Sequence, residues 1–132
     1  MRHRVKGKKL SRSTNQRQAL FKSQVSSLIL KSQIKTTEAK AKAIKGLIDK
    51  LITKAKKGSL SARRQVLSFL PNKKVVNQLF DVIAPATKDR SSGFTRVIRL
   101  GRRRGDNTQM AKIELIDKPL VDKKNSKVAK KK

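Results

Sequence analysis

Apolar residues recur at helical spacing through the first half of the chain. The pattern from Leu20 to Ile29 predicts a helix that begins after Ser13. Ser13 and Gln16 have the spacing of a capping box, in which each side chain bonds the backbone of the other residue. The pattern fades at Lys31. The segment 33–36 is too short to assign, so a brief strand and a turn both stay open.

The clearest predicted element is a second helix, which Thr36 or Thr37 caps. Glu38 lies in its first turn, where the helix dipole favours an anion, and Gly58 follows its end. One continuous stripe of apolar residues should face the core: Ile44, Leu47, Ile48, Leu51, Ile52 and Ala55. The opposite face is basic: Lys40, Lys42, Lys45, Lys50, Lys54, Lys56 and Lys57.

Two shorter helices should follow. A helix over about residues 61–70 ends at Pro71, and Asn72 caps the next helix, for which Pro85 is the predicted terminator. Residues 84–92 are then predicted to form a loop. The positions expected to be buried are Val66, Leu67, Leu70, Val75, Val76, Leu79, Phe80 and Ile83.

Beyond residue 93 the apolar positions alternate, which predicts two strands at 94–100 and 110–116. The connection 101–108 contains two glycines, an aspartate and an asparagine, as a hairpin loop does. One face of the strands should hold Phe94, Ile98 and Leu100, and Ala111, Ile113 and Leu115. The expected fold class is therefore α+β, with about four helices packed on one face of a small, mainly antiparallel sheet.

The net charge indicates the kind of partner. The 132 residues include 36 Lys and Arg against 8 Asp and Glu, a formal charge of +28, whereas a small soluble domain usually carries roughly 2–8. Such a chain repels itself unless a polyanion neutralises it, so nucleic acid is the first candidate. We expect a basic N-terminal arm at 1–12, a globular domain at 13–116 and a lysine-rich C-terminal tail at 117–132.

Composition excludes several other classes. The chain has no Cys, and its single His cannot build a His-rich site, so we expect no cofactor and no bound metal. No apolar run approaches the roughly 20 residues of a membrane span, and the N-terminal residues lack the apolar core of a secretory signal. No phosphate-binding glycine loop or nucleophile motif occurs, so we expect neither enzyme activity nor a small-molecule substrate.

The hairpin connection is the first candidate site, because arginine forks match phosphate oxygens and stay charged. Three adjacent arginines would repel one another without a partner, although Asp106 stands among them, where pairing should lower its pKa. A solvated charge run is the alternative. The hairpin residues expected to bind are Arg96, Arg99, Arg102, Arg103 and Arg104. The N-terminal arm adds Arg2, His3, Arg4, Lys6, Lys8, Lys9 and Arg12.

Three rival classes share some of these features. A DNA-compacting protein would also be small, basic and free of cysteine, but we find neither an apolar dimer surface nor a minor-groove arm with a proline wedge. A membrane-active protein would leave its apolar helix faces exposed, whereas the core needs them here. An RNA-modifying enzyme would need a catalytic set. The scarcity of aromatic residues favours reading of RNA shape and backbone over bases.

Three ordered stretches resemble the bacterial large-subunit ribosomal protein seventeen family. The first is Met1-Arg2-His3-Arg4 with Leu10-x-Arg12. The second is Ile34-x-Thr36-Thr37-x-Ala39-Lys40-Ala41-Lys42, leading into Leu51-Ile52-Thr53. The third is Gly93-Phe94-Thr95-Arg96 and Gly101-x-Arg103-Arg104-Gly105-Asp106, with Met110-Ala111 and Glu114. The family commonly has His-Arg at Gln16-Arg17 and Tyr at Phe94, and the tail beyond residue 117 lies outside the resemblance.

The resemblance implies a structural, cytoplasmic protein of the large ribosomal subunit. Such proteins bind 23S rRNA on the solvent side, near the exit of the peptide tunnel, and contact neighbouring ribosomal proteins. It also implies a single copy per ribosome rather than a homo-oligomer, and no membrane contact. Arg17, Lys40 and Lys42 join the predicted rRNA-binding residues. The working hypothesis is that the hairpin and the arm bridge phosphates of separate rRNA segments.

Overall fold

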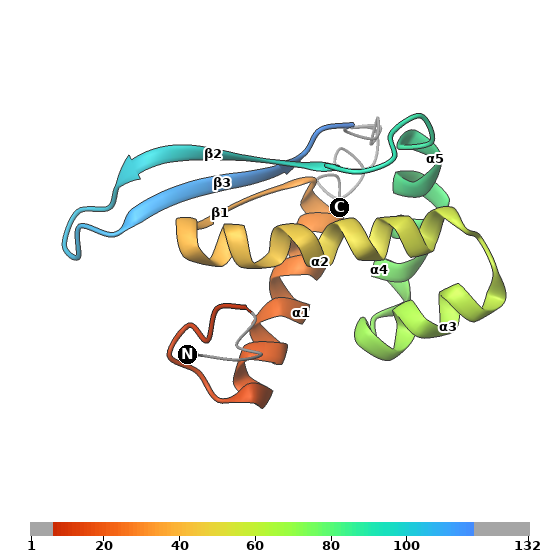
Figure 1. Cartoon of the computed structure of the whole chain (residues 1–132), viewed down its shortest axis with the longest axis horizontal. Helices are drawn as coiled ribbons and strands as arrows, with labels where there is room; N and C mark the ends of the chain where they lie inside the picture. Colours follow the sequence, from red (N-terminus) through yellow and green to blue (C-terminus); the bar gives the residue numbers. More distant parts are fainter. Residues whose placement is uncertain (1–6, 118–132) are drawn as a thin grey trace, which may run out of the picture.

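The computed structural model describes residues 7–117 of the chain. In this part of the chain, four helices lie on one side of a three-stranded antiparallel sheet, the first two of them packed against it, which confirms the predicted α+β class (Figure 1). Four of the predicted arm residues, Arg2, His3, Arg4 and Lys6, and the tail from residue 118 lie outside the described residues. The predicted domain boundaries at residues 12 and 117 stay predictions.

The first helix, α1 (Thr14–Lys31), begins with the predicted capping box. The Gln16 N–H donates to the Ser13 hydroxyl, and the Ser13 N–H donates to the Gln16 side-chain oxygen. The helix ends at Ser32, whose left-handed backbone (φ 60°) turns the chain into strand β1 (Gln33–Thr37). The Ser32 carbonyl accepts from the Leu115 N–H at 3.0 Å. The short segment that the sequence left open is therefore a strand.

Replacing Ser13 with alanine should lower the free energy of unfolding by about 1 kcal/mol, since the first turn of α1 loses a cap. Chemical denaturation followed by circular dichroism measures this change. The matched control is Ser61→Ala, at an exposed position inside α3, where we expect a change within about 0.5 kcal/mol. Equal stabilities of the two variants would contradict a stabilising capping box.

Helix α2 (Glu38–Lys56) follows β1 directly and packs against all three strands. Thr37 is its N-cap, as one of the two predicted candidates, but its side chain makes no capping hydrogen bond. Gly58 lies beyond the helix with φ +66°, as predicted for a left-handed position that favours glycine. The predicted apolar stripe is confirmed, with Leu47 only partly buried and Ala41 added to the core.

Helix α3 (Leu60–Phe69) comes next. After it, α4 (Lys73–Gln78), the π-helical turn η1 (Leu79–Ile83) and α5 (Ala84–Ala86) together form one continuous helix. The prediction that Pro85 ends this helix is therefore wrong, and the loop begins after residue 86. The Ala84 N–H bonds the Leu79 carbonyl five residues back, so the backbone is already widened ahead of the proline. The Thr87 hydroxyl and N–H both bond the Ile83 carbonyl and close the helix.

Two predicted core positions in these helices are less buried than expected. Leu67 in α3 and Phe80 in η1 are half-buried and pack against the edge of the core. The remaining six predicted positions are buried: Val66, Leu70, Val75, Val76, Leu79 and Ile83.

Strands β2 (Thr95–Arg102) and β3 (Gln109–Leu115) form the predicted hairpin, and β3 lies in the centre of the sheet. Arg99 pairs with Ala111 and Gly101 with Met110, so Leu100 is an extra residue in a bulge. Leu100 is 46% exposed, and the predicted place of Ile98 and Leu100 on the core face is wrong. Val97 packs against the core instead, while Ile98 lies on the other face of the sheet, opposite Lys112.

The hairpin projects beyond the N-terminal end of α2, with its tip far from the other helices (Figure 1). Arg102 is the last residue of β2 rather than a loop residue, and the connection runs over residues 103–108. The β2–β3 hairpin is thus a narrow basic extension of the helical part of the domain.

Candidate nucleic-acid interface

The turn at the hairpin tip is fixed by Asp106. Its carboxylate accepts from Arg103 Nε at 3.1 Å and Arg103 Nη2 at 2.5 Å, and from the Thr108 N–H at 3.3 Å. The Arg103 N–H bonds the Thr108 carbonyl at 2.9 Å. Gly105 takes φ +98°, a conformation that glycine adopts without strain. The tip is therefore an ordered loop with one arginine bound inside it.

The predicted pairing of Asp106 with the arginines around it is confirmed, and its partner is Arg103. Among residues 7–117, Arg102 and Arg104 form no ion pair, and both are exposed. The tip thus presents two unneutralised guanidinium groups, on either side of one that Asp106 neutralises. An ion pair between exposed side chains is worth only about 0–1 kcal/mol, so a phosphate can also compete with Asp106 for Arg103.

The hydrogen bond from Arg103, followed by that from Thr108, holds the pKa of Asp106 well below its usual value. Because the pKa is lower in the folded state, the stabilisation is present above the ordinary aspartate pKa of about 3.9 and is lost as pH falls through the lower folded value. Asp106 should therefore stay ionised where ordinary aspartates protonate.

A carboxyl carbon NMR titration measures this pKa. Arg103→Gln removes the largest cause of the shift, so the Asp106 pKa should rise in that variant. Arg104→Gln is the matched control and should leave it unchanged. An Asp106 pKa that is the same in Arg103→Gln as in the native protein would contradict the assigned pair.

A second group of cations meets in a hollow at the base of the hairpin. Lys8 from the N-terminal segment, Lys42 from α2 and Arg99 from β2 line it together with Glu38. One oxygen of Glu38 accepts from Lys42 Nζ at 2.6 Å and lies 3.0 Å from Arg99 Nη2. Three residues that the sequence assigned to an arm, a helix and a hairpin therefore lie around a single carboxylate. We call this set the basal hollow (Lys8, Glu38, Lys42 and Arg99).

The exposed fractions within the basal hollow show how it is built. The side chain of Arg99 is 70% exposed and that of Lys42 51%, whereas Glu38 is 19% exposed. The carboxylate thus lies beneath the cations. The Lys42 ammonium and, to a smaller extent, the Arg99 guanidinium lower the pKa of Glu38, against its desolvation. Sequence reasoning placed Glu38 only at a helix start, and its i,i+4 spacing to Lys42 was the one local signal for this pairing.

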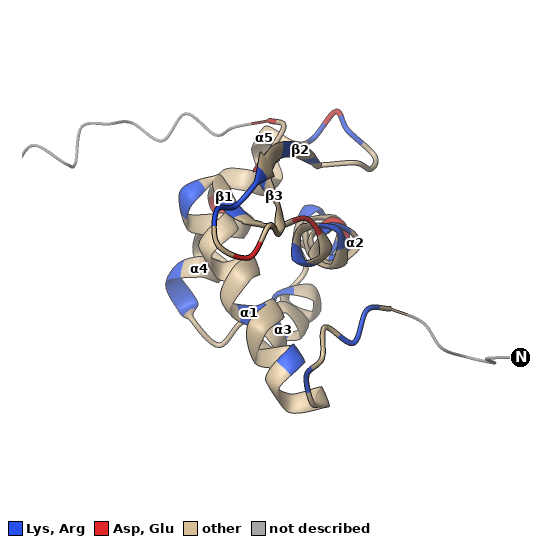
Figure 2. Ribbon diagram, turned by 90° about the vertical axis from the view of Figure 1, so that its left-hand side faces the viewer, with Lys and Arg blue, Asp and Glu red and all other residues tan. Residues whose placement is uncertain are grey.

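The structure does not bring the other predicted residues into these two groups. Arg17 donates from Nη1 to the Arg12 carbonyl at 3.2 Å, so it fastens the N-terminal segment to α1. Arg96 lies opposite Glu114 on the outer face of the sheet. Lys9 is exposed, and Lys40 is half-buried on α2. Figure 2 shows basic segments on several elements around the hairpin.

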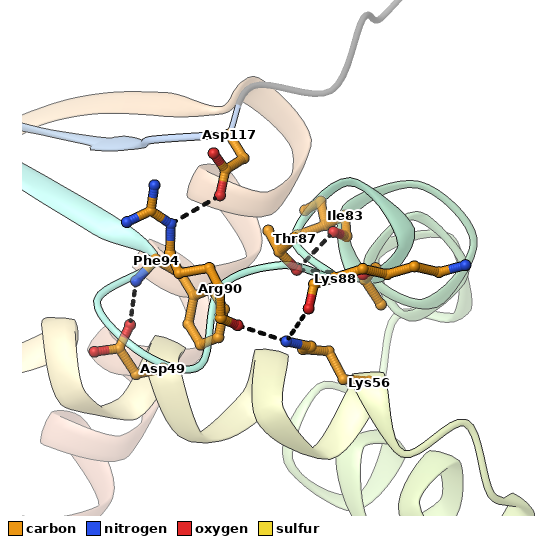
Figure 3. A network of polar contacts seen from close by, with 9 residues as sticks. Asp49, Lys56, Ile83, Thr87, Lys88, Arg90, Phe94 and Asp117 are labelled. Carbon is orange, nitrogen blue, oxygen red and sulfur yellow. Dashed lines mark hydrogen bonds and ion pairs between the residues drawn. The ribbon is translucent and has the colours of Figure 1, made fainter.

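One lysine on the predicted basic face of α2 serves the fold. Lys56 Nζ donates to the carbonyls of Lys88 at 3.1 Å and Arg90 at 2.5 Å, and lies 5.5 Å from the centroid of the Phe94 ring (Figure 3). Asp49, also on α2, accepts from the Phe94 N–H at 3.2 Å. These bonds tie the loop before β2 to α2, so Lys56 stabilises the fold.

Replacing Lys56 with methionine should lower the free energy of unfolding by about 1–3 kcal/mol, because two loop carbonyls lose their donor while the apolar stem remains. Lys57→Met, at the exposed neighbouring position, should change it by about 0.5 kcal/mol or less. Urea denaturation compares the two variants. A loss of stability that is equal in both would contradict a clamp by Lys56.

No helix within residues 7–117 is long and apolar enough to cross a membrane. The same part of the chain contains no cluster of three or more His, Asp or Glu side chains suited to a metal ion.

Comparisons with known proteins match this chain to one family. The family model described as ribosomal protein L17 matches residues 20–116. The large ribosomal subunit protein bL17 of Thermodesulfovibrio yellowstonii is 46% identical over 99% of this chain and 98% of its own length. That of Geobacter metallireducens is 45% identical over 96% of this chain and 71% of its own length, and that of Desulforapulum autotrophicum is 49% identical over 88% and 97%.

Proposed function

The chain belongs to the ribosomal protein L17 family, and from this membership we propose that it is a structural, non-enzymatic constituent of the large ribosomal subunit, in the cytoplasm. Its partners are then rRNA and neighbouring ribosomal proteins. The observation that carries the proposal is the match over nearly the whole chain to relatives named as large-subunit proteins. The charge of +28 supports an RNA partner.

We further propose that the protein bridges separate segments of 23S rRNA through phosphate contacts. Arg102 and Arg104 at the hairpin tip bind one segment. The basal hollow, where Lys8 extends the contact toward the N-terminal arm, binds another. By placing cations between two polyanionic segments, the protein lowers their mutual repulsion and fixes their spacing. Position on the solvent side near the tunnel exit and a single copy per ribosome are expected from the family resemblance.

Glu38 orders Arg99 of the basal hollow, and Asp106 orders the tip that carries Arg102 and Arg104. Each carboxylate holds an arginine of the hairpin in place before RNA arrives, with Glu38 bound to Arg99 and Asp106 to Arg103. Ordering these long side chains in advance reduces the entropy that binding would otherwise remove. The acidic residues thus keep the hairpin in one conformation despite its charge.

Fractionation of cells tests the proposed function. Ribosomal subunits are separated after washing at increasing salt concentration, and the protein is followed in each fraction. We expect it to remain with the large subunit through washes that remove loosely bound basic proteins. Release at low salt, or recovery with chromosomal DNA, would contradict the proposal and favour the DNA-compacting alternative.

A further inference from the structure

We propose that the groove between α1 and β1 binds a third sugar-phosphate stretch of rRNA, a contact that neither the family match nor the sequence pattern assigns. The inference rests on the proposed function, because it takes rRNA as the partner. We call this surface the α1–β1 groove, lined by Ser23, Gln24, Ser27, Lys31, Gln33 and Lys35.

The spacing of these residues gives the groove two polar walls. Ser23, Ser27 and Lys31 follow one another at intervals of four residues, so they lie along one face of α1. On β1, Thr36 lies on the side that faces α1. Gln33 and Lys35 lie on the other face of the strand, opposite Glu114 and Lys112, and line the groove from the open edge of β1. Hydroxyl, amide and ammonium groups therefore line a hollow that runs from the middle of α1 to its end.

The backbone of β1 adds further donors beside the groove. β1 is an edge strand, since the sheet order is β1-β3-β2. The Ser32 carbonyl accepts from β3 at Leu115, and the antiparallel pattern alternates, so the N–H and C=O groups of Gln33 and Lys35 point away from β3. These backbone groups have no partner within the sheet, and an incoming backbone with oxygen acceptors can bond their N–H groups.

Charge identifies the occupant as a polyanion. No carboxylate of residues 7–117 lines the α1–β1 groove, while Lys31 and Lys35 are both exposed. Ile34 is the one apolar side chain in the lining, whereas a groove for a peptide strand or helix offers several apolar pockets. Serine hydroxyls and amides suit phosphate and ribose oxygens, which the two lysines attract.

The groove is largely formed without RNA. Gln24 Nε2 donates to the Thr36 hydroxyl at 3.1 Å and so joins the two walls. The α1–β1 groove borders the basal hollow, since Thr36 lines the groove and the next residue, Thr37, lines the hollow. The third stretch of rRNA therefore lies beside the stretch bound at the basal hollow.

The salt dependence of rRNA binding gives the first test. Lys31→Gln with Lys35→Gln should lower the magnitude of the slope of log K against log salt by about 1.4–1.8, for two phosphates at roughly 0.7–0.9 each. Lys45→Gln with Lys50→Gln removes the same charge from exposed positions on α2 and should change the slope less. Equal changes in the two pairs would overturn the assignment of the groove.

Cross-linking gives the second test, and the inference requires the expected result in both tests. Because the chain contains no cysteine, Ser23→Cys allows one photoreactive group to be attached at the exposed end of the groove. In assembled large subunits we expect an adduct with rRNA. An adduct with a ribosomal protein alone, or no adduct, would overturn the inference.

The same experiments separate this inference from the proposed function. If Arg102→Ala with Arg104→Ala weakens rRNA binding and the groove variant does not, the groove inference alone fails. If the protein is absent from washed large subunits, both the proposed function and the groove inference fail.

Discussion

Replacing Arg102 and Arg104 together with alanine should lower the magnitude of the salt slope of rRNA binding by about 1.4–1.8. In the proposed interface, each exposed guanidinium at the hairpin tip neutralises one phosphate and releases counterions from it. The tip projects from the helical base (Figure 1), so the fold should be unaffected by this change. Filter binding to an rRNA fragment over a range of salt concentrations measures the slope, and affinity at low salt should fall more than affinity at high salt.

Two controls separate phosphate contact from general loss of charge. Lys73→Ala with Lys74→Ala removes the same charge from exposed positions at the start of α4 and should change the slope less. Arg103→Gln disrupts the turn held by Asp106, so it should weaken binding at all salt concentrations with a smaller change in slope. A native slope in the Arg102 and Arg104 double variant would remove the hairpin tip from the interface.

Replacing Phe94 with alanine should lower the free energy of unfolding by about 3–5 kcal/mol, the usual loss for a buried ring. Phe94 is 1% exposed and lies where α2, the loop before β2 and the sheet meet. Its N–H is held by Asp49, and Lys56 lies over its ring. Truncation leaves a cavity beneath Lys56, which its bonds to the Lys88 and Arg90 carbonyls hold in place. Since total stability of such a domain is about 5–15 kcal/mol, much of it should be lost.

Urea denaturation followed by circular dichroism measures this change. Leu60→Ala, at a position that is 65% exposed, should alter the free energy of unfolding by about 0.5 kcal/mol or less. Phe94→Leu keeps part of the buried volume and should fall between the two. A loss below about 1 kcal/mol in Phe94→Ala would contradict its place at the centre of the core.

The helices were predictable because their signals are local. The capping box of Ser13 and Gln16, the apolar stripe of α2 and Gly58 at its end all lie within a few residues of the backbone they fix. Strand β1 was not predictable, because its five residues become a strand through pairing with β3, about eighty residues later in the chain. Such pairing leaves no periodic signal in so short a segment.

Two errors came from irregular backbone. A proline normally ends a helix, but the π turn before Pro85 changes which carbonyls are bonded, and the helix continues to Ala86. Alternation from Phe94 placed Ile98 and Leu100 in the core. Thr95 beside Phe94 is buried as well, so the core face of β2 is the one that carries Thr95 and Val97. Neither the π turn nor this break in the alternation has a simple composition, so the sequence pattern indicates the regular alternative.

The candidate site also has one part that local sequence signals predicted and one part that they did not. Asp106 lies three residues from Arg103, and the predicted lowering of its pKa is confirmed. The basal hollow joins Lys8, Glu38 and Arg99 from three distant parts of the chain, and only folding brings them together. Local spacing therefore predicted the ion pair at the tip, while the second cationic surface required the tertiary structure.

Hydroxyl-radical footprinting of rRNA in assembled large subunits tests the bridging claim most directly. Subunits that contain the native chain, Arg102→Ala with Arg104→Ala, or Lys8→Gln with Lys9→Gln are compared. The account predicts that the hairpin variant (Arg102→Ala with Arg104→Ala) exposes one protected rRNA segment and that Lys8→Gln with Lys9→Gln exposes a different one. Exposure of the same nucleotides by both variants, or protection that neither variant alters, would contradict the claim that this protein bridges separate segments.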